Sequence, residues 1–209
     1  MNNTELILIR HGETLWNTQL RMQGSLDSEL THKGELQIKA LGEWMKEVPF
    51  DYLYSSDTLR ARKTAESISK YSGHPLNFDK RLREKNLGIF EGLTSEEAKE
   101  RYPESFKLFK TAGANYAIDK GESTQQLLDR ALDVIEEIRN LHPHKVSVLV
   151  THGGVVRVLM KHVLEIPLDT STQFLISNTA IFRLVWKDKW TVSEMGVLSH
   201  LGKINDVPI

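Results

Sequence analysis

Cysteine is absent from the 209 residues of this chain, and its absence excludes several kinds of chemistry. A chain without cysteine has no disulfide bond, no thiolate nucleophile and no cysteine ligand for a metal. The redox compartment stays open on this evidence, and we take the cytoplasm as the default expectation.

The chain also has no excess of charge of either sign. Lys and Arg together number 27 and Asp and Glu 28, which gives a formal net charge of −1. A chain of this balance gives no reason to expect a nucleic-acid partner. Any anionic ligand must therefore be bound by a local cluster of positive groups.

Long hydrophobic runs are missing as well. The most apolar stretch, after Gly153, is interrupted by Arg157, Lys161 and His162. It falls short of the roughly 18 apolar residues that cross a bilayer. The first residues carry no basic stretch and no long apolar run, so no signal peptide is expected. We therefore expect a soluble protein with no membrane partner.

What the sequence does contain is the pattern of an α/β protein. Short β-branched runs at 6–9, 52–54 and 146–150 predict buried strands. Helical periodicity follows at 31–48, 56–71 and 123–141, and again after Gly153. Runs at 180–186 and 190–197 predict a terminal hairpin. This alternation predicts an α/β three-layer sandwich with a mainly parallel central sheet flanked by helices.

The sequence shows no repeat, linker or low-complexity tract, so we expect one domain over residues 1–209. Residues 81–121 differ from the rest because they are charged and broken by glycine and proline. We interpret them as an insertion of short helices that covers the active site. Phe106, Phe109 and Tyr116 in this insertion suggest a partly apolar substrate pocket.

Two histidines directly follow predicted strands. His11 lies between Arg10 and Gly12 after the first strand, and His152 follows the strand at 146–150 and opens a helix. Ligands of open α/β sheets bind beyond the carboxyl ends of the strands. The start of a helix adds free N–H groups and a favourable dipole for an anion. A phosphate group fits this description.

Arg60 adds a third group from the segment after the second predicted strand. If the helix there begins near Ser56, Arg60 lies one turn into it and its guanidinium reaches the same pocket. Such a fork can bind two phosphate oxygens at once, and Arg10 supplies a second fork.

With these residues in view, the chain resembles the histidine phosphatase superfamily, the phosphoglycerate mutase-like proteins, and specifically their small, broad-specificity phosphatase branch. The matching blocks occur in family order and span most of the chain. They are residues 8–14 (LIRHGET), Trp16-Asn17, Gln23-Gly24, the segment from Ser55 to Ala61, Leu82-Arg83-Glu84 with Gly88 and Phe90-Glu91-Gly92, and residues 150–154 (VTHGG).

The resemblance implies a role for each matching residue. His11 would be the nucleophile and Glu84 the proton donor, while Arg10, Arg60 and His152 would bind the transferring phosphoryl group. The same resemblance places Asn17, Gln23, Gly24 and the backbone of Gly153 in phosphate or substrate binding. It implies a phosphatase for small phosphate monoesters, without a cofactor and without a metal. We assign no role to the other six histidines: His32, His74, His142, His144, His162 and His200.

Elementary chemistry agrees with these roles. A neutral imidazole is a competent nucleophile near pH 7, since its reference pKa is about 6.5. Fixed positive groups can stabilise the charge on the transferring phosphoryl oxygens. A carboxyl group can protonate the leaving oxygen and later accept a proton from the attacking water.

Several alternatives stay open. A mutase would return the phosphoryl group from His11 to a sugar acid, but the short segment between the Glu84 and His152 blocks favours hydrolysis. A pathway-specific enzyme, such as a ribazole-phosphate phosphatase, would use the same chemistry. A metal-dependent hydrolase could be built on His11, His152 and Glu84, although nearby arginines would repel the cation. A catalytically inactive phosphate-binding domain is the alternative that we favour least, because both the nucleophile and the acid are present. The sequence predicts neither the substrate nor the oligomeric state.

Overall fold

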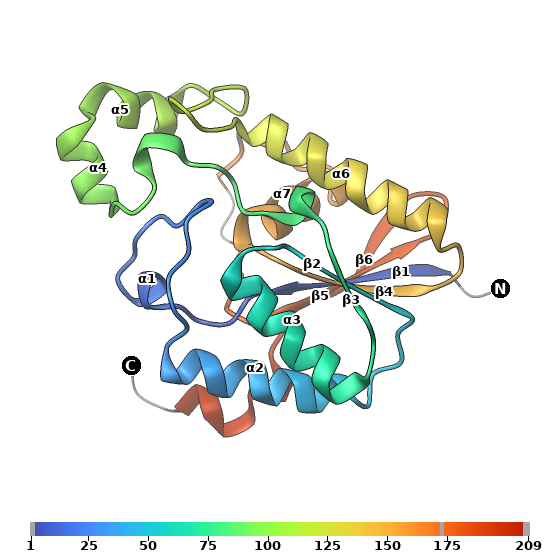
Figure 1. The fold of residues 1–209 in the computed structure, drawn as a ribbon. Helices are drawn as coiled ribbons and strands as arrows, with labels where there is room; N and C mark the ends of the chain where they lie inside the picture. Colours follow the sequence, from blue (N-terminus) through green and yellow to red (C-terminus); the bar gives the residue numbers. More distant parts are fainter. Residues whose placement is uncertain (1–2, 172–173, 207–209) are drawn as a thin grey trace.

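The computed structural model describes residues 3–171 and 174–206 of the chain. In this described part, six strands form one mixed sheet in the order β3-β2-β4-β1-β5-β6 (Figure 1). The strands are β1 (Thr4–Arg10), β2 (Tyr52–Ser55), β3 (Leu76–Phe78), β4 (Val146–Thr151), β5 (Ile181–Trp186) and β6 (Trp190–Val197).

The pairing of the strands is mainly parallel. β4 runs parallel to both β1 and β2, and β2 runs parallel to β3. β5 pairs with β1 in the antiparallel sense, and β6 completes an antiparallel hairpin with it. The α/β class, the mainly parallel sheet and the terminal hairpin are therefore confirmed.

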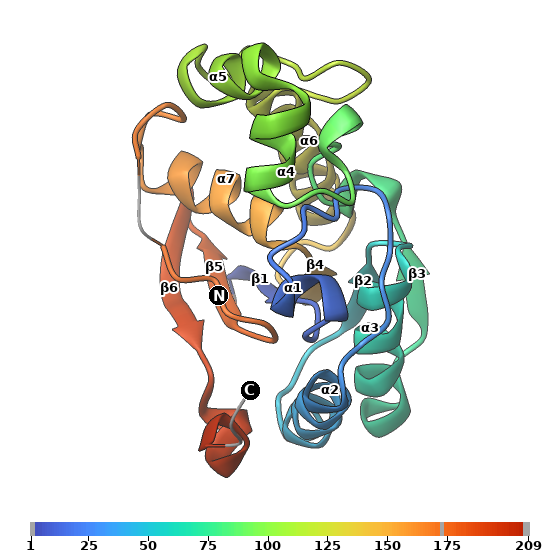
Figure 2. The same cartoon turned by 90° about the vertical axis from the view of Figure 1, so that its left-hand side faces the viewer.

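Helices cover both faces of the sheet and make it the middle of three layers. One face carries α2 (His32–Met45) and α3 (Leu59–Ser72), and the other carries α6 (Thr124–Leu141) and α7 (Gly153–Val163) (Figures 1 and 2). The side chains of β1 alternate between the two cores. Leu6 and Leu8 join the core under α6 and α7, whereas Ile7 and Ile9 join the core under α2 and α3. Burial on both faces explains why this strand is a continuous apolar run.

The insertion consists of short helices, as the sequence predicts. Its helices are the 3-10 turns Lys80–Leu82 and Gly88–Phe90, α4 (Ser95–Arg101) and α5 (Pro103–Thr111). They have a small core of their own around Phe90, Ala98 and Ile118. Phe106, Phe109 and Tyr116 pack against that core and do not line the cavity at His11, because buried aromatic area is what holds these short helices together. These three residues therefore do not supply the apolar lining expected of them; Met22 and Leu87 are apolar residues that line this cavity.

Three details of the chain path also differ from the sequence predictions. α3 begins at Leu59 and not near Ser56. The short helix α1 (Leu15–Thr18) and the three-residue strand β3 escaped prediction, because so few residues carry no periodicity. A further 3-10 segment, Ser199–Asp206, follows β6. Among the described residues, no helix is both long enough and apolar enough to cross a membrane.

The central sheet should dominate the stability of the fold. Leu149 in β4 is fully buried, whereas Leu141 at the end of α6 is 62% exposed. We expect Leu149→Ala to lower the free energy of unfolding by about 2–5 kcal/mol and Leu141→Ala by less than about 0.5 kcal/mol. Equilibrium unfolding in urea measures both. Equal losses for the two leucines would contradict this arrangement of the core.

Candidate active site

The two strand-end histidines meet because of the register of β1 and β4. Ile9 pairs with Val150 and Arg10 pairs with Thr151, so the next residue of each strand lies at the same edge of the sheet. The rings of His11 and His152 have their centroids 5.1 Å apart. Both side chains are buried, with 3% and 0% of their area exposed. The juxtaposition that the sequence predicted is present.

The hydrogen bond of His11 settles which ring nitrogen is free. Nδ1 lies 2.8 Å from the backbone carbonyl of Gly12. A carbonyl oxygen can only accept, so Nδ1 must carry the proton and Nε2 keeps its lone pair. Burial, together with the nearby Arg60 and Arg10, lowers the pKa of His11 well below its usual value. His11 is therefore a neutral imidazole near pH 7 with one nitrogen available for nucleophilic attack.

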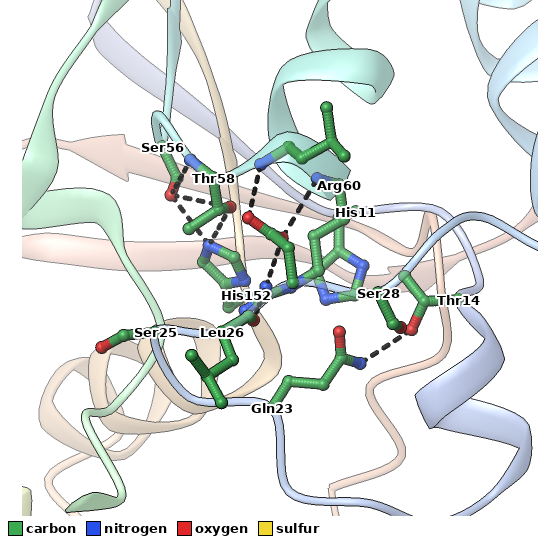
Figure 3. A network of polar contacts seen from close by, with 12 residues as sticks. His11, Thr14, Gln23, Ser25, Leu26, Ser28, Ser56, Thr58, Arg60 and His152 are labelled. Carbon is green, nitrogen blue, oxygen red and sulfur yellow. Dashed lines mark hydrogen bonds and ion pairs between the residues drawn. The ribbon is translucent and has the colours of Figure 1, made fainter. Parts of the chain in front are cut away.

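His152 is held by hydroxyl groups that follow β2. Its Nε2 lies 2.9 Å from Oγ of Ser56 and 3.3 Å from Oγ1 of Thr58 (Figure 3). Its buried Nδ1 has no hydrogen-bond partner among the described residues. Burial lowers the pKa of His152 well below its usual value, and Arg60 and His11 add to that effect. A buried ring nitrogen without a partner is a candidate contact for a ligand.

Arg60 is the most deeply buried cation of the site, with 1% of its area exposed. Nη1 donates to the carbonyl of Leu26 and to Oδ1 of Asp27, both at 2.7 Å, and Nη2 donates to the carbonyl of Gly24 at 2.8 Å. Nε has no partner in the described part of the chain. Part of the guanidinium thus anchors a loop, while Nε and the second N–H of Nη2 are left to donate to a ligand.

Asp27 also explains why α3 begins later than predicted. Its carboxylate accepts from the backbone N–H of Leu59 at 2.9 Å and of Arg60 at 3.4 Å. Thr58, the residue before the helix, makes no side-chain capping bond. A carboxylate from a distant loop thus caps the helix and pairs with its arginine. Arg60 lies in the first turn of the helix and not one turn further in.

Gly24 and Gln23 shape the same loop. Gly24 has φ +52°, a conformation that favours glycine, and a Cβ there would lie 2.0 Å from Oε1 of Glu91 and displace that side chain. That Glu91 oxygen accepts from the backbone N–H of Ser25 at 2.8 Å, which ties the loop to the insertion. Nε2 of the buried Gln23 donates to Oγ1 of Thr14 at 2.8 Å (Figure 3).

Arg10 approaches the site from the end of β1. Its Nη1 donates to the carbonyl of Ile176 at 2.6 Å, and its Nε has no partner among the described residues. Burial lowers the pKa of Arg10, and the nearby Glu84 carboxylate partly opposes this effect. The guanidinium lies over the start of α7, where Nε is 3.6 Å from the position of a Cβ on Gly153.

Glu84 is fixed by backbone N–H groups. Its Oε2 accepts from Gly154 at 3.0 Å and its Oε1 from Lys85 at 2.8 Å. A Cβ on Gly154 would lie 2.0 Å from Oε1 of Glu84, so the second glycine of the motif makes room for the carboxylate. The start of α7 therefore serves Glu84 as well as any anion, which the sequence interpretation did not foresee.

An arginine of α6 supports the backbone beneath Glu84. Arg130 donates through Nη1 to the carbonyls of Arg81 and Arg83, both at 2.7 Å, and through Nη2 to the carbonyl of Glu84 at 2.9 Å. Its Nε donates to Glu122 at 3.0 Å. Arg130 and Glu122 are missing from the sequence prediction, because one polar position on an amphipathic helix carries no signal of its partners.

These groups surround a cavity of about 300 Å³. Its lining residues are Arg10, His11, Asn17, Arg21, Met22, Gln23, Gly24, Arg60, Glu84, Lys85, Leu87 and Gly154. Seven of the nine residues expected at the site line it. His152 and Gly153 do not; His152 lies against the ring of His11 instead. Asn17 lies in the short helix α1. The sequence did not predict four other lining residues, because their position at the cavity depends on how the insertion folds over the strand ends. They are Arg21, Met22, Lys85 and Leu87.

Two neutral imidazoles, two guanidinium groups and a carboxylate thus meet at one edge of the sheet of an α/β protein, and groups of these kinds can bind a phosphate. In agreement with this, residues 6–197 match the model of the histidine phosphatase superfamily (branch 1). The chain therefore belongs to the histidine phosphatase superfamily.

Individual relatives carry the names of mutases and of phosphatases. The chain is 36% identical over 200 residues to phosphoglycerate mutase-like protein 4 of Arabidopsis thaliana, covering 94% of this chain and 86% of the relative. The solved structure of Bacillus stearothermophilus YhfR has 35% identity and a TM-score of 0.87, covering 95% and 99% of the two chains. A mycobacterial glucosyl-3-phosphoglycerate phosphatase in complex with VO3 has 28% identity and a TM-score of 0.81, covering 93% and 99%.

The buried histidines should make stability depend on pH. The folded pKa values of His11 and His152 lie well below 6.5, so below that pH the unfolded chain binds protons that the folded chain does not. Stability is therefore fully present above about pH 6.5 and is lost as the pH falls, by about 1.4 kcal/mol per pH unit for each imidazole.

His11→Gln tests this dependence. We expect the variant to lose a large part of the fall in unfolding free energy between pH 7 and pH 5, measured by denaturant titration at several pH values. Replacement of the exposed His32 by Gln is the matched control and should leave the slope unchanged. An unaltered slope in His11→Gln would show that this imidazole is not held neutral.

Proposed function

We propose that this protein hydrolyses small phosphate monoesters through a phosphohistidine intermediate on His11. The observation that carries the proposal is the hydrogen bond from Nδ1 of His11 to the carbonyl of Gly12. It leaves Nε2 unprotonated in a cavity that Arg10, Arg60 and Glu84 also line. A nucleophile, its anion-binding groups and a proton carrier are thus present in one place.

In the first step, the lone pair of Nε2 of His11 forms a bond to phosphorus as the ester P–O bond breaks. Glu84 gives its proton to the departing oxygen, so that an alcohol leaves and not an alkoxide. In the second step, water attacks phosphorus, the N–P bond breaks and Glu84 takes the proton of the water. Inorganic phosphate leaves, and His11 returns to its neutral form.

Fixed positive charge would supply most of the acceleration. The transferring group carries negative charge on its equatorial oxygens. Nε of Arg10 and Nε of Arg60 lack partners in the described part of the chain, as does Nδ1 of His152. These N–H donors and this ring nitrogen are held by the surrounding protein before the ligand arrives, so they need no reorganisation during the reaction.

A metal cofactor is not part of the proposal. Burial is the main cause of the lowered pKa of His11 and of His152, and the guanidinium groups of Arg10 and Arg60 add to it. The same two charges would repel a divalent cation at these imidazoles. Among the described residues, no group of three or more His, Asp or Glu side chains could hold a metal ion.

Mutase-type transfer is the second candidate, because the name of the Arabidopsis relative points to it. It would share the first step and differ only in the acceptor of the second. Hydrolysis is supported by the short connection between Glu84 and His152 and by the phosphatase name of the mycobacterial neighbour. Pathway-specific phosphatases remain within the proposal, whose partner is a small phosphate monoester.

Trapping of the intermediate tests the proposal. With a ³²P-labelled monoester, excess chelator and no bisphosphate, we expect steady release of inorganic phosphate and an acid-labile label on the peptide that contains His11. His11→Ala should lose at least about 1,000-fold in turnover and take no label, while His32→Ala keeps both. Label on another side chain would refute the mechanism, and release only when a bisphosphate is added would favour the mutase.

Substitution of the two glycines at the start of α7 tests the role of Glu84 as the acid. Gly154→Ala places a Cβ 2.0 Å from Oε1 of Glu84, whereas Gly153→Ala meets nothing nearer than 3.6 Å. We expect Gly154→Ala to slow alkyl phosphates about 100-fold and activated aryl phosphates far less, since loss of the acid matters most for poor leaving groups. Gly153→Ala places its Cβ near Arg10 and not near Glu84, so any loss of activity should be the same for both ester types. Equal slowing of both by Gly154→Ala would remove Glu84 from the acid role.

A further inference from the structure

Asn178, which precedes β5, connects two parts of the site that are far apart in sequence. Its Nδ2 donates to the backbone carbonyl of His11 at 3.0 Å and to Oδ1 of Asn17 at 3.2 Å. It also lines the larger cavity, of about 700 Å³, which shares Arg10, Asn17, Arg21 and Met22 with the cavity at His11. No sequence motif drew attention to this residue.

The contacts of Asn17 show what the hydrogen bond from Asn178 does. Oδ1 of Asn17 accepts from the backbone N–H of Thr14 at 3.1 Å, from the hydroxyl of Thr14 at 3.1 Å and from Asn178. Three donors thus surround the amide oxygen, which fixes the orientation of the amide. Because Asn17 lines the cavity at His11, its NH₂ group is left to donate to a ligand there.

The backbone carbonyl of His11 determines the orientation of the Asn178 side-chain amide. A backbone carbonyl is always an acceptor, so the atom of Asn178 that faces it must be Nδ2 and not Oδ1. The same nitrogen then requires an acceptor on Asn17. Asn178 therefore reinforces, from the backbone that carries the nucleophile, the same orientation of the Asn17 amide that the backbone N–H of Thr14 favours.

The next residue, Thr179, fixes the turn that carries Asn178 through several hydrogen bonds. Thr179 has φ +59°, a costly conformation for a β-branched residue. Its N–H donates to the carbonyl of Arg10 at 3.0 Å, and its hydroxyl donates to the carbonyl of Asn178 at 2.7 Å. The hydroxyl must then accept from Nε2 of His200, 3.0 Å away, which is neutral because burial lowers its pKa to about 4. The strained residue Thr179 is thus hydrogen-bonded to the backbone at the end of β1, next to His11.

We propose that Asn178 is a positioning residue that sets the Asn17 amide with its NH₂ group toward the phosphoryl oxygens. This inference rests on the proposed function, because the ligand of Asn17 is the phosphoryl group. Asn178 touches no reacting atom itself. It acts by donating one NH₂ group to Asn17 and to the strand end of His11 at once.

The proposal predicts different results for two substitutions. Asn178→Ala removes one of three donors to Oδ1 of Asn17 and leaves Thr14 to orient the amide. We expect it to weaken the binding of inorganic phosphate about 5-fold. Asn178→Asp places a carboxylate oxygen against the acceptors on Asn17 and His11. The repulsion favours rotation of the Asn17 amide, which would turn its oxygen to the anion, and we expect about 100-fold weaker binding.

A double-mutant cycle on phosphate affinity decides the question. Calorimetric titration with inorganic phosphate is carried out on the wild type, Asn17→Ala, Asn178→Ala and the double variant. If Asn178 acts through Asn17, then Asn178→Ala should change affinity less than about twofold once Asn17 is alanine. Asn77→Ala is the matched control, since its amide donates to the carbonyl of Leu53 away from the site, and it should leave affinity unchanged.

Additive effects in the cycle would overturn the proposal, as would wild-type phosphate affinity in Asn178→Asp. If Asn178→Asp fails to fold, the alanine cycle still decides. A wild-type protein that binds phosphate and releases it from esters, but shows no coupling, would refute this inference alone. A wild-type protein that does neither would refute the proposed function as well.

Discussion

The parallel pairing of β1 with β4 is the constraint on which the site depends. Its register places the residues after Arg10 and Thr151 side by side, and both of those residues are histidines. β2 pairs with β4 in the same sense, which brings Ser56 and Thr58 to the second imidazole. A slip of one residue along either strand would reverse every side chain of that strand between the two cores. The hydrophobic alternation that stabilises the sheet therefore also aligns the nucleophile.

Buried charge is the second constraint. A guanidinium group that leaves water is costly unless hydrogen bonds replace its hydration. Arg60 donates hydrogen bonds to Asp27 and to two backbone carbonyls of the loop, and Arg10 donates one to the carbonyl of Ile176. Each arginine keeps a nitrogen without a partner in the described structure. Burial, together with this positive charge, keeps both imidazoles neutral, and the site retains capacity for an anion.

The fold could be predicted well because its signals are local. Strand and helix periodicity, glycine and proline at the ends of elements and the alternation of strands with helices gave the α/β class. The strand-end rule then selected Arg10, His11 and His152 from the polar residues. Arg60 and Glu84 were found as well, Arg60 from its helix and Glu84 through the family resemblance. Elements of three or four residues, such as β3 and α1, gave too little periodicity to be recognised.

By itself, the sequence determined the layers of the protein and the chemical groups that its strand ends present, because both depend on side-chain type and spacing along the chain. Only the tertiary structure decided how those groups are held. Asp27 on Arg60, Arg130 beneath Glu84 and Asn178 between His11 and Asn17 are contacts between residues from 33 to 167 positions apart. A polar residue carries no record of a partner so distant in sequence, since that partner is chosen by the packing of whole elements.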